Sequence, residues 1–272
     1  MRARPGAVLA AALGLCLLAY AGVHLAASQS ASQSAELPPA PFVESLWQGG
    51  VPDAPAAPDY APSASIAAAA RLQETGLWPL SQSWYEYTPD GQPPKAAVVL
   101  LHGAGRDGLS MLEMWQATAD RHGLLLIAPN AGPMRFGALG HRAVTGTARG
   151  VAVAHGLPAE GLYLFGHSDG AVLAQDLVSS ASPGQWRAAA LHAGYRPEDG
   201  LGTAATDSPL RLYLGDADPI FPTAPARASL RAMAARGHPA ELITIRGHGH
   251  WFYRIGPAIA EDSWRWFDSL QP

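Results

Sequence analysis

Hydrophobic and polar positions follow two alternating patterns from about residue 81 onward. Short apolar runs of strand length recur, and apolar residues stand at helical spacing in the stretches between them. The predicted strands cover 83–87, 96–101, 124–128, 161–165, 188–192, 210–214 and 241–245. The predicted helices cover 109–122, 141–156, 169–180, 223–236 and 256–270. Strands that alternate with helices predict an α/β fold with a mainly parallel, doubly wound sheet covered on both faces.

The first 80 residues follow a different pattern. Two arginines precede an apolar run over residues 7–27, so we predict that 1–28 is a signal peptide or an N-terminal membrane anchor. Both alternatives imply export, to the periplasm or out of the cell, with attachment to the inner membrane if 7–27 is retained. Residues 29–80 are rich in Ala, Ser and Pro and predict a tether with a short helix near 63–72. The catalytic domain is then expected over 81–272.

Composition narrows the classes of function. The hydrophobic fraction of 48% suits a globular protein with a sizeable core. The net charge is −4, and 18 basic residues are scattered without a basic stripe, so we expect no nucleic-acid partner. Cys16 is the only cysteine and lies in the N-terminal apolar run. We therefore expect no disulfide, no metal and no cofactor in the folded part.

A candidate nucleophile stands at residues 166–170, with the sequence Gly-His-Ser-Asp-Gly. A predicted strand precedes this Gly-x-Ser-x-Gly pattern and a predicted helix follows it, which places Ser168 on a strand-to-helix turn. The flanking glycines suit a sharp turn whose two sides approach closely. The pattern is short, so its partners must support any catalytic role.

A serine hydroxyl becomes a good nucleophile when a histidine removes its proton and a carboxylate stabilises that histidine. Candidate acids follow the strand at 210–214, namely Asp216 and Asp218, and candidate bases follow the strand at 241–245, namely His248 and His250. These residues stand at the carboxyl ends of strands, where α/β sheets bind ligands. A His-x-His pair can also bind a metal, but no further ligand stands at a familiar spacing.

Residues 96–272 resemble the α/β-hydrolase superfamily, in particular its compact, lidless esterases and lipases, such as phospholipase/carboxylesterase and polyhydroxybutyrate-depolymerase-like members. Four motifs carry the resemblance: His-Gly-Ala-Gly at 102–105, the pentapeptide at 166–170, Gly-x-x-Asp-Pro at 215–219, and a glycine-flanked His near the C-terminus. The chain order Ser, Asp, His is the one that this fold uses. The resemblance implies a triad of Ser168, Asp218 and His250, with an oxyanion hole of the Ala104 and Asp169 backbone amides. Gly105 is the alternative to Ala104 if the loop is set one residue differently.

The function that the resemblance implies is hydrolysis of a carboxylic ester through an acyl-enzyme intermediate. The segment 194–209 is too short for a helical lid, so no sizeable cap domain is expected. The substrate would be a small-molecule, lipid or polyester ester. A peptidase or amidase on the same fold is the alternative enzyme, and a catalytically silent binding module is the alternative from another class.

The remaining histidines have simpler interpretations. We expect His102 to fix the oxyanion loop by hydrogen bonding and His167 to pack beside the turn. His192 is expected to be a hydrogen-bonded residue at a strand end, with a place in the pocket as the alternative. Four others stand in no motif and are expected at the surface: His122, His141, His155 and His238. One of the aromatic residues at 251–253 is a candidate for binding an acyl or aryl group.

Overall fold

The computed structural model of the protein describes residues 37–51, 60–75, 82–130, 138–202 and 206–271. These residues belong to one compact unit. The predicted signal peptide or anchor lies outside the described residues. Within the described ranges, no helix combines the length and the apolar character needed to cross a bilayer.

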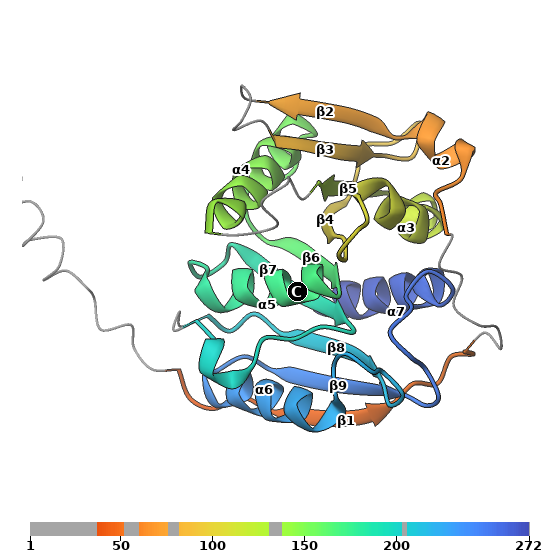
Figure 1. Ribbon diagram of the computed structural model, residues 1–272. Coiled ribbons are helices and arrows are strands. Elements are labelled where there is room, and N and C mark those ends of the chain that lie inside the picture. Colours follow the sequence, from red (N-terminus) through yellow and green to blue (C-terminus); the bar gives the residue numbers. More distant parts are fainter. Residues whose placement is uncertain (1–36, 52–59, 76–81, 131–137, 203–205, 272) are drawn as a thin grey trace, which may run out of the picture. The chain divides into compact units, whose positions relative to one another are not determined.

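The described strands form one nine-stranded sheet with the order β1-β9-β8-β7-β6-β4-β5-β3-β2 (Figure 1). Most neighbours are parallel, whereas β3 runs antiparallel to both β5 and β2. The strands are β1 (Phe42–Leu46), β2 (Arg71–Thr75), β3 (Gln82–Tyr87), β4 (Ala96–Leu101), β5 (Leu124–Pro129), β6 (Leu162–His167), β7 (Trp186–His192), β8 (Leu210–Gly215) and β9 (Ala240–Ile245). The predicted α/β class with a mainly parallel sheet is confirmed.

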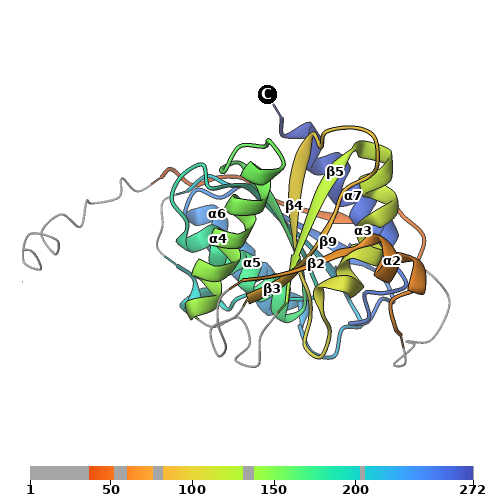
Figure 2. The ribbon, with the colours of Figure 1, turned by 90° about the horizontal axis from the view of Figure 1, so that it is seen from above.

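Helices cover both faces of this sheet (Figure 2). One face carries α4 (Ala138–Ala154), α5 (Asp169–Ser180) and α6 (Thr223–Ala235), and the other carries α3 (Gly108–His122) and α7 (Gly256–Ser269). Each face has its own cluster of buried apolar side chains. Strands β4, β5 and β6 are almost continuously apolar because they are covered on both sides.

Helix α3 illustrates how local sequence sets the bounds of an element. Asp107 precedes its first residue, and the carboxylate accepts a hydrogen bond of 3.1 Å from the amide of Ser110. At the other end, the amide of Gly123 donates to the carbonyl of Ala119 at 2.8 Å. These caps satisfy backbone groups that a helix leaves without intrahelical partners.

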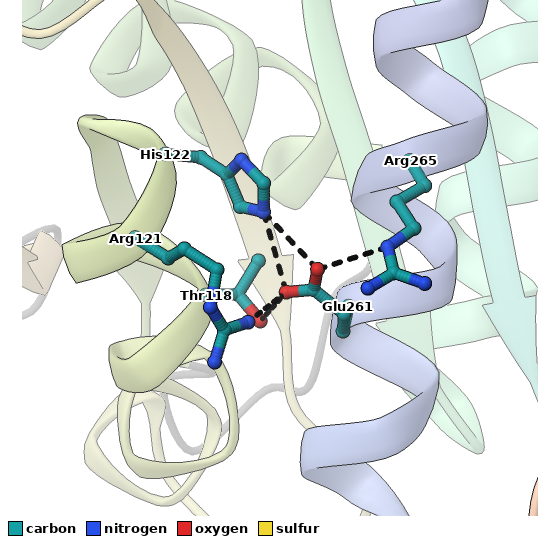
Figure 3. Close-up of polar contacts among 5 residues, drawn as sticks. All are labelled: Thr118, Arg121, His122, Glu261 and Arg265. Atoms are coloured by element: carbon teal, nitrogen blue, oxygen red, sulfur yellow. Dashed lines mark hydrogen bonds and ion pairs between the residues drawn. The ribbon is translucent and has the colours of Figure 1, made fainter.

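Glu261 joins helix α7 to helix α3 (Figure 3). Its carboxylate accepts hydrogen bonds from Arg121 and, at 3.4 Å, from Thr118, both on α3. It also contacts Nε2 of His122 at 3.2 Å and accepts a bond of 3.0 Å from Arg265 one turn along α7. The cluster fixes α7, which follows directly on the loop that carries His250.

The segment predicted to be a tether contains two strands that join the sheet. Strand β1 pairs with β9 at one edge, and β2 pairs with β3 at the other. The expected short helix is present as α2 (Ala64–Ala69), and the Ser63 hydroxyl caps its first turn. The two strands escaped prediction because all five residues of β2 are exposed and β1 buries none fully, so neither has an apolar face to recognise.

Candidate active site

Ser168 lies on a strained turn between strand β6 and helix α5. Its φ of 55° and ψ of −121° place it in a region that side-chain-bearing residues rarely occupy. A Cβ on Gly166 would lie 2.3 Å from the carbonyl oxygen of Gly170, and one on Gly170 would lie 2.1 Å from that of Leu101. Both flanking positions therefore require glycine, and the turn holds the Ser168 hydroxyl at the carboxyl end of the sheet.

The structure brings Ser168, His250 and Asp218 into one hydrogen-bonded chain. Nε2 of His250 lies 3.0 Å from Oγ of Ser168, and Nδ1 of His250 lies 2.9 Å from Oδ2 of Asp218. The three side chains come from the loops that follow β6, β9 and β8. A neutral His250 that donates from Nδ1 to Asp218 can accept the Ser168 proton at Nε2.

Asp218 is held ionised by its surroundings. Its side chain is fully buried, and its Oδ1 accepts hydrogen bonds from the amides of Ile220 at 2.8 Å and Phe221 at 3.0 Å. Burial alone would raise the pKa of the Asp218 carboxyl, but the hydrogen bonds from His250, Phe221 and Ile220 outweigh it and lower the pKa. A carboxylate in this state stabilises positive charge on His250.

The two alternative candidates, Asp216 and His248, make hydrogen bonds that join the two loops. The carboxylate of Asp216 accepts a hydrogen bond of 2.7 Å from the amide of Gly247, and the carbonyl of His248 accepts one of 3.1 Å from the amide of Ala217. A Cβ on Gly215 would lie 1.9 Å from the carbonyl oxygen of His248. The loop after β8, which carries Asp218, is therefore packed directly against the loop after β9, which carries His250.

The loop after β4 lies beside the nucleophile, as the oxyanion-hole prediction requires. A Cβ on Gly103 would lie 3.2 Å from Cβ of Ser168, and Ala104 is the next residue. Nδ1 of His102 lies 2.9 Å from the carbonyl oxygen of Gly103 within this loop, the kind of contact expected of that side chain. Asp169 is the first residue of helix α5 and directly follows Ser168. Asp169 is thus the chain neighbour of Ser168, and Ala104 is the chain neighbour of Gly103, which lies against Ser168.

Arg106 ties this loop to a segment that the sequence did not connect with the site. Its Nη1 donates to the carbonyl oxygen of Tyr60 at 2.6 Å, and its guanidinium lies 5.1 to 5.4 Å from the ring centres of Tyr60, Trp251 and Tyr253. Tyr60 and Tyr253 stack at 4.3 Å. No motif marks Tyr60, because its partners stand 46 and more residues away in the chain.

As expected, His167 packs beside the turn and His192 is hydrogen-bonded at the end of β7, but the sequence did not predict that both join His248 in one cluster. His167, His192 and His248 are all buried, and their ring nitrogens face one another. The expectation that His238 lies at the surface is wrong: it is 1% exposed, and its Nδ1 lies 3.0 Å from the carbonyl oxygen of Ser208. Its polar partner is 30 residues away in the chain, so no local pattern indicates its burial.

The His-x-His pair at 248–250 was the one candidate for metal binding that the sequence offered. Among the residues whose placement is described, no group of three or more His, Cys, Asp or Glu side chains could hold a metal ion. The two histidines diverge in their contacts, since His250 faces Ser168 and Asp218 whereas His248 faces His192.

Comparison with known proteins places the fold. No protein-family model and no curated protein matches the sequence. Among solved structures, esterase PE8 matches with a TM-score of 0.56 and 21% identity, over 72% of this chain and 99% of that chain. Esterase Est2 of the Planctomycetes species Thermogutta terrifontis, with butyrate bound, matches with a TM-score of 0.61 and 17% identity over 74% and 94%.

An S-formylglutathione hydrolase from Agrobacterium tumefaciens matches with a TM-score of 0.61 and 14% identity, over 74% of this chain and 95% of that chain. In each comparison, the matched region covers nearly the whole length of the solved chain. The expected α/β-hydrolase fold, of the compact type that these esterases have, is therefore confirmed.

Proposed function

We propose that this chain is a serine hydrolase that cleaves carboxylic esters through an acyl-enzyme intermediate. The observation that carries the proposal is the hydrogen-bonded chain from Ser168 through His250 to the buried Asp218. The strained turn at Ser168 and the neighbouring loop at 102–105 support it, because a nucleophile and oxyanion donors must converge on one carbonyl group. The likeness of fold to solved esterases adds further support.

In the first half of the reaction, Oγ of Ser168 attacks the ester carbonyl carbon while Nε2 of His250 takes the hydroxyl proton. The carbonyl oxygen becomes an oxyanion, for which the amides of Ala104 and Asp169 are the proposed donors, each worth about 3 to 4 kcal/mol of barrier in other enzymes. Asp218 stabilises the imidazolium. His250 then protonates the leaving alcohol as the ester bond breaks, which leaves Ser168 acylated.

In the second half, water replaces the alcohol. His250 takes a proton from water, whose oxygen attacks the acyl carbon, and the same amides hold the oxyanion. Collapse breaks the bond to Oγ of Ser168, and His250 returns the proton to that oxygen. The products are a carboxylic acid and a regenerated serine, so the cycle consumes one ester and one water.

Apolar side chains beside the proposed base favour substrates with an apolar part. Phe221 stacks on His250 with ring centres 5.7 Å apart, and neighbouring Ile220 is 61% exposed. Trp251, next to His250, is half-buried against Arg106 and Tyr253. A small-molecule, lipid or polyester ester is the substrate class that we propose. Est2 of Thermogutta terrifontis has been solved with propionate and with butyrate bound, so short acyl chains are the first to test.

The test is steady-state kinetics of the purified protein on 4-nitrophenyl esters of graded acyl length, with aminoacyl 4-nitroanilides in parallel. We expect ester turnover, and we expect Ser168→Ala to lower kcat at least about 10⁴-fold because the nucleophile is lost. Anilide turnover that exceeded ester turnover would identify an amidase instead. Equal ester rates for the parent and Ser168→Ala would refute the mechanism.

A matched pair of variants separates the acid from its neighbour. Asp218→Asn removes the charge that stabilises His250, and we expect kcat to fall about 10³- to 10⁴-fold. Asp216→Asn keeps an oxygen that can accept from the Gly247 amide, so its kcat should stay within about threefold of the parent. The reverse order would assign the acid to Asp216.

A further inference from the structure

Three buried histidines form a hydrogen-bonded chain beside the proposed triad. Nδ1 of His167 lies 3.0 Å from Nδ1 of His192, and Nε2 of His192 lies 3.2 Å from Nε2 of His248. Their exposed fractions are 4%, 0% and 7%. The reaction described above assigns none of them a role, although burying three imidazoles costs free energy unless each finds a partner.

The chemistry of imidazole fixes how this chain is bonded. A neutral ring has one N–H donor and one acceptor nitrogen. His192 uses both of its nitrogens, so if it donates to one neighbour it accepts from the other. Replacing His192 by an apolar residue would therefore leave two buried polar groups without their partner, whereas an amide side chain offers one donor and one acceptor again.

Burial keeps the three rings uncharged. Burial and the neighbouring histidines together lower the pKa of His192 well below the ordinary value and that of His167 to about 3. Burial also lowers the pKa of His248, although nearby Asp218 opposes the shift. Neutral rings are needed here because His167 lies 5.2 Å from His250, ring centre to ring centre, and a charge there would oppose protonation of His250.

The positions of the three residues connect the loops that carry the nucleophile and the base. His167 ends β6 and immediately precedes Ser168, His192 ends β7, and His248 stands two residues before His250. The carbonyl of His192 also accepts the Ser168 amide at 2.9 Å. The three histidine side chains therefore link the loop that carries Ser168 to the loop that carries His250, although the two loops are far apart in sequence.

Phe252 supports the bridge from one side. Its ring centre lies 5.1 Å from that of His167 and 5.1 Å from that of His192. Because Phe252 is fully buried and belongs to the same loop as His250, the histidine chain is packed against the segment whose position it would control. Rotation of either ring is restricted by this packing as well as by the hydrogen bonds.

We propose that His167, His192 and His248 are positioning residues that hold Ser168 and His250 at the separation needed for proton transfer. This inference rests on the proposed ester hydrolysis. It predicts a defect in the chemical step, because displacement of a catalytic group by about 1 Å can cost about 10²-fold in rate. Substrate binding is not expected to change, since none of the three rings is exposed enough to contact substrate.

The test compares His192→Leu with His192→Gln. We expect His192→Leu to lower kcat about 10- to 100-fold with KM within about threefold of the parent. His192→Gln restores a donor and an acceptor. Its log kcat should therefore lie at least about halfway from that of His192→Leu to that of the parent. The rate of Ser168 inactivation by a fluorophosphonate should follow kcat, and the fraction of sites labelled at completion corrects for any unfolded protein.

His238 provides the matched control, because it is equally buried but lies outside the site. His238→Leu should lower the melting temperature and leave kcat per labelled site unchanged. Since His192→Leu could fail to fold, His248→Leu and His248→Gln, at the more exposed end of the chain, repeat the comparison.

The outcomes are distinct. A loss of kcat in the Leu variants that the Gln variants relieve supports positioning. Parent-like kcat per labelled site in both Leu variants, or equal defects in the Leu and Gln variants, would overturn it. If the parent itself neither hydrolysed esters nor became labelled at Ser168, the proposed function would fail, and the positioning role would fail with it.

Discussion

At the scale of single residues, buried histidines are the feature that most distinguishes this site. Burial lowers the pKa of four histidines at the site and of His238 outside it. The four are His102, His167, His192 and His248. A buried neutral imidazole resists protonation in the folded state, whereas the same group in the unfolded chain binds a proton below about pH 6.5. Folding stability is thereby linked to pH.

The sign of this linkage follows from the lowered pKa values. The unfolded chain binds more protons than the folded chain below about pH 6.5, so stability is present above that pH and is lost as the pH falls. As the pH falls from the pKa of the unfolded chain to that of the folded chain, each such histidine lowers the free energy of unfolding by up to about 1.4 kcal/mol per pH unit. Urea unfolding at pH 7, 6 and 5 should therefore give a free energy of unfolding that declines steeply.

His238→Gln tests the origin of that decline without touching the site. The variant lacks one of the five titrating groups. Its free energy of unfolding should therefore fall less steeply with decreasing pH than that of the parent, by up to about 1.4 kcal/mol per pH unit. Ordinary carboxylates titrate mainly below about pH 4.5 and contribute little in this range. A free energy of unfolding that stayed level from pH 7 to pH 5 would contradict the account.

At the scale of elements, close contact between β4 and the start of α5 sets the position of Ser168, the proposed nucleophile. Gly170 stands where a Cβ would lie 2.1 Å from the carbonyl oxygen of Leu101, a backbone atom that cannot move aside alone. Gly146, in helix α4, has open space where its Cβ would be. The same substitution should therefore have opposite effects at the two positions.

We expect Gly170→Ala to destabilise the protein by about 1 to 3 kcal/mol through overpacking. Gly146→Ala should stabilise it by about 0.5 to 1 kcal/mol, because alanine favours the helix and the site has room. Urea unfolding of both variants measures the two free energies. Similar stability for the two variants would mean that α5 does not pack on β4 as closely as described.

Prediction from the sequence succeeded for elements with a clear apolar face. The expected strand at 96–101 and helix at 169–180 have the observed bounds of β4 and α5. Strands β1 and β2 were missed because an edge strand does not need an apolar face, and its residues here stay largely exposed. The spacing of apolar residues predicts only elements with a buried face. It therefore misses a strand that is held mainly by backbone hydrogen bonds to one neighbouring strand.

At the scale of the whole molecule, strand order decides which residues meet. The motifs at 102–105, 166–170, 215–219 and 247–250 were visible because each is a short, continuous sequence. The bridge from His167 to His248 was not visible, because it depends on β6, β7, β8 and β9 lying side by side. The contact of Arg106 with Tyr60 likewise joins the loop after β4 to a segment far from it in sequence.

Every proposal above depends on Ser168 being a nucleophile that His250 and Asp218 activate. The most direct measurement is the intact mass of the protein after reaction with a fluorophosphonate, followed by mapping of the modified peptide. The account predicts one adduct per chain, on Ser168, and no adduct on Ser168→Ala under the same conditions. An unmodified parent protein, or an adduct that persisted in Ser168→Ala, would contradict it.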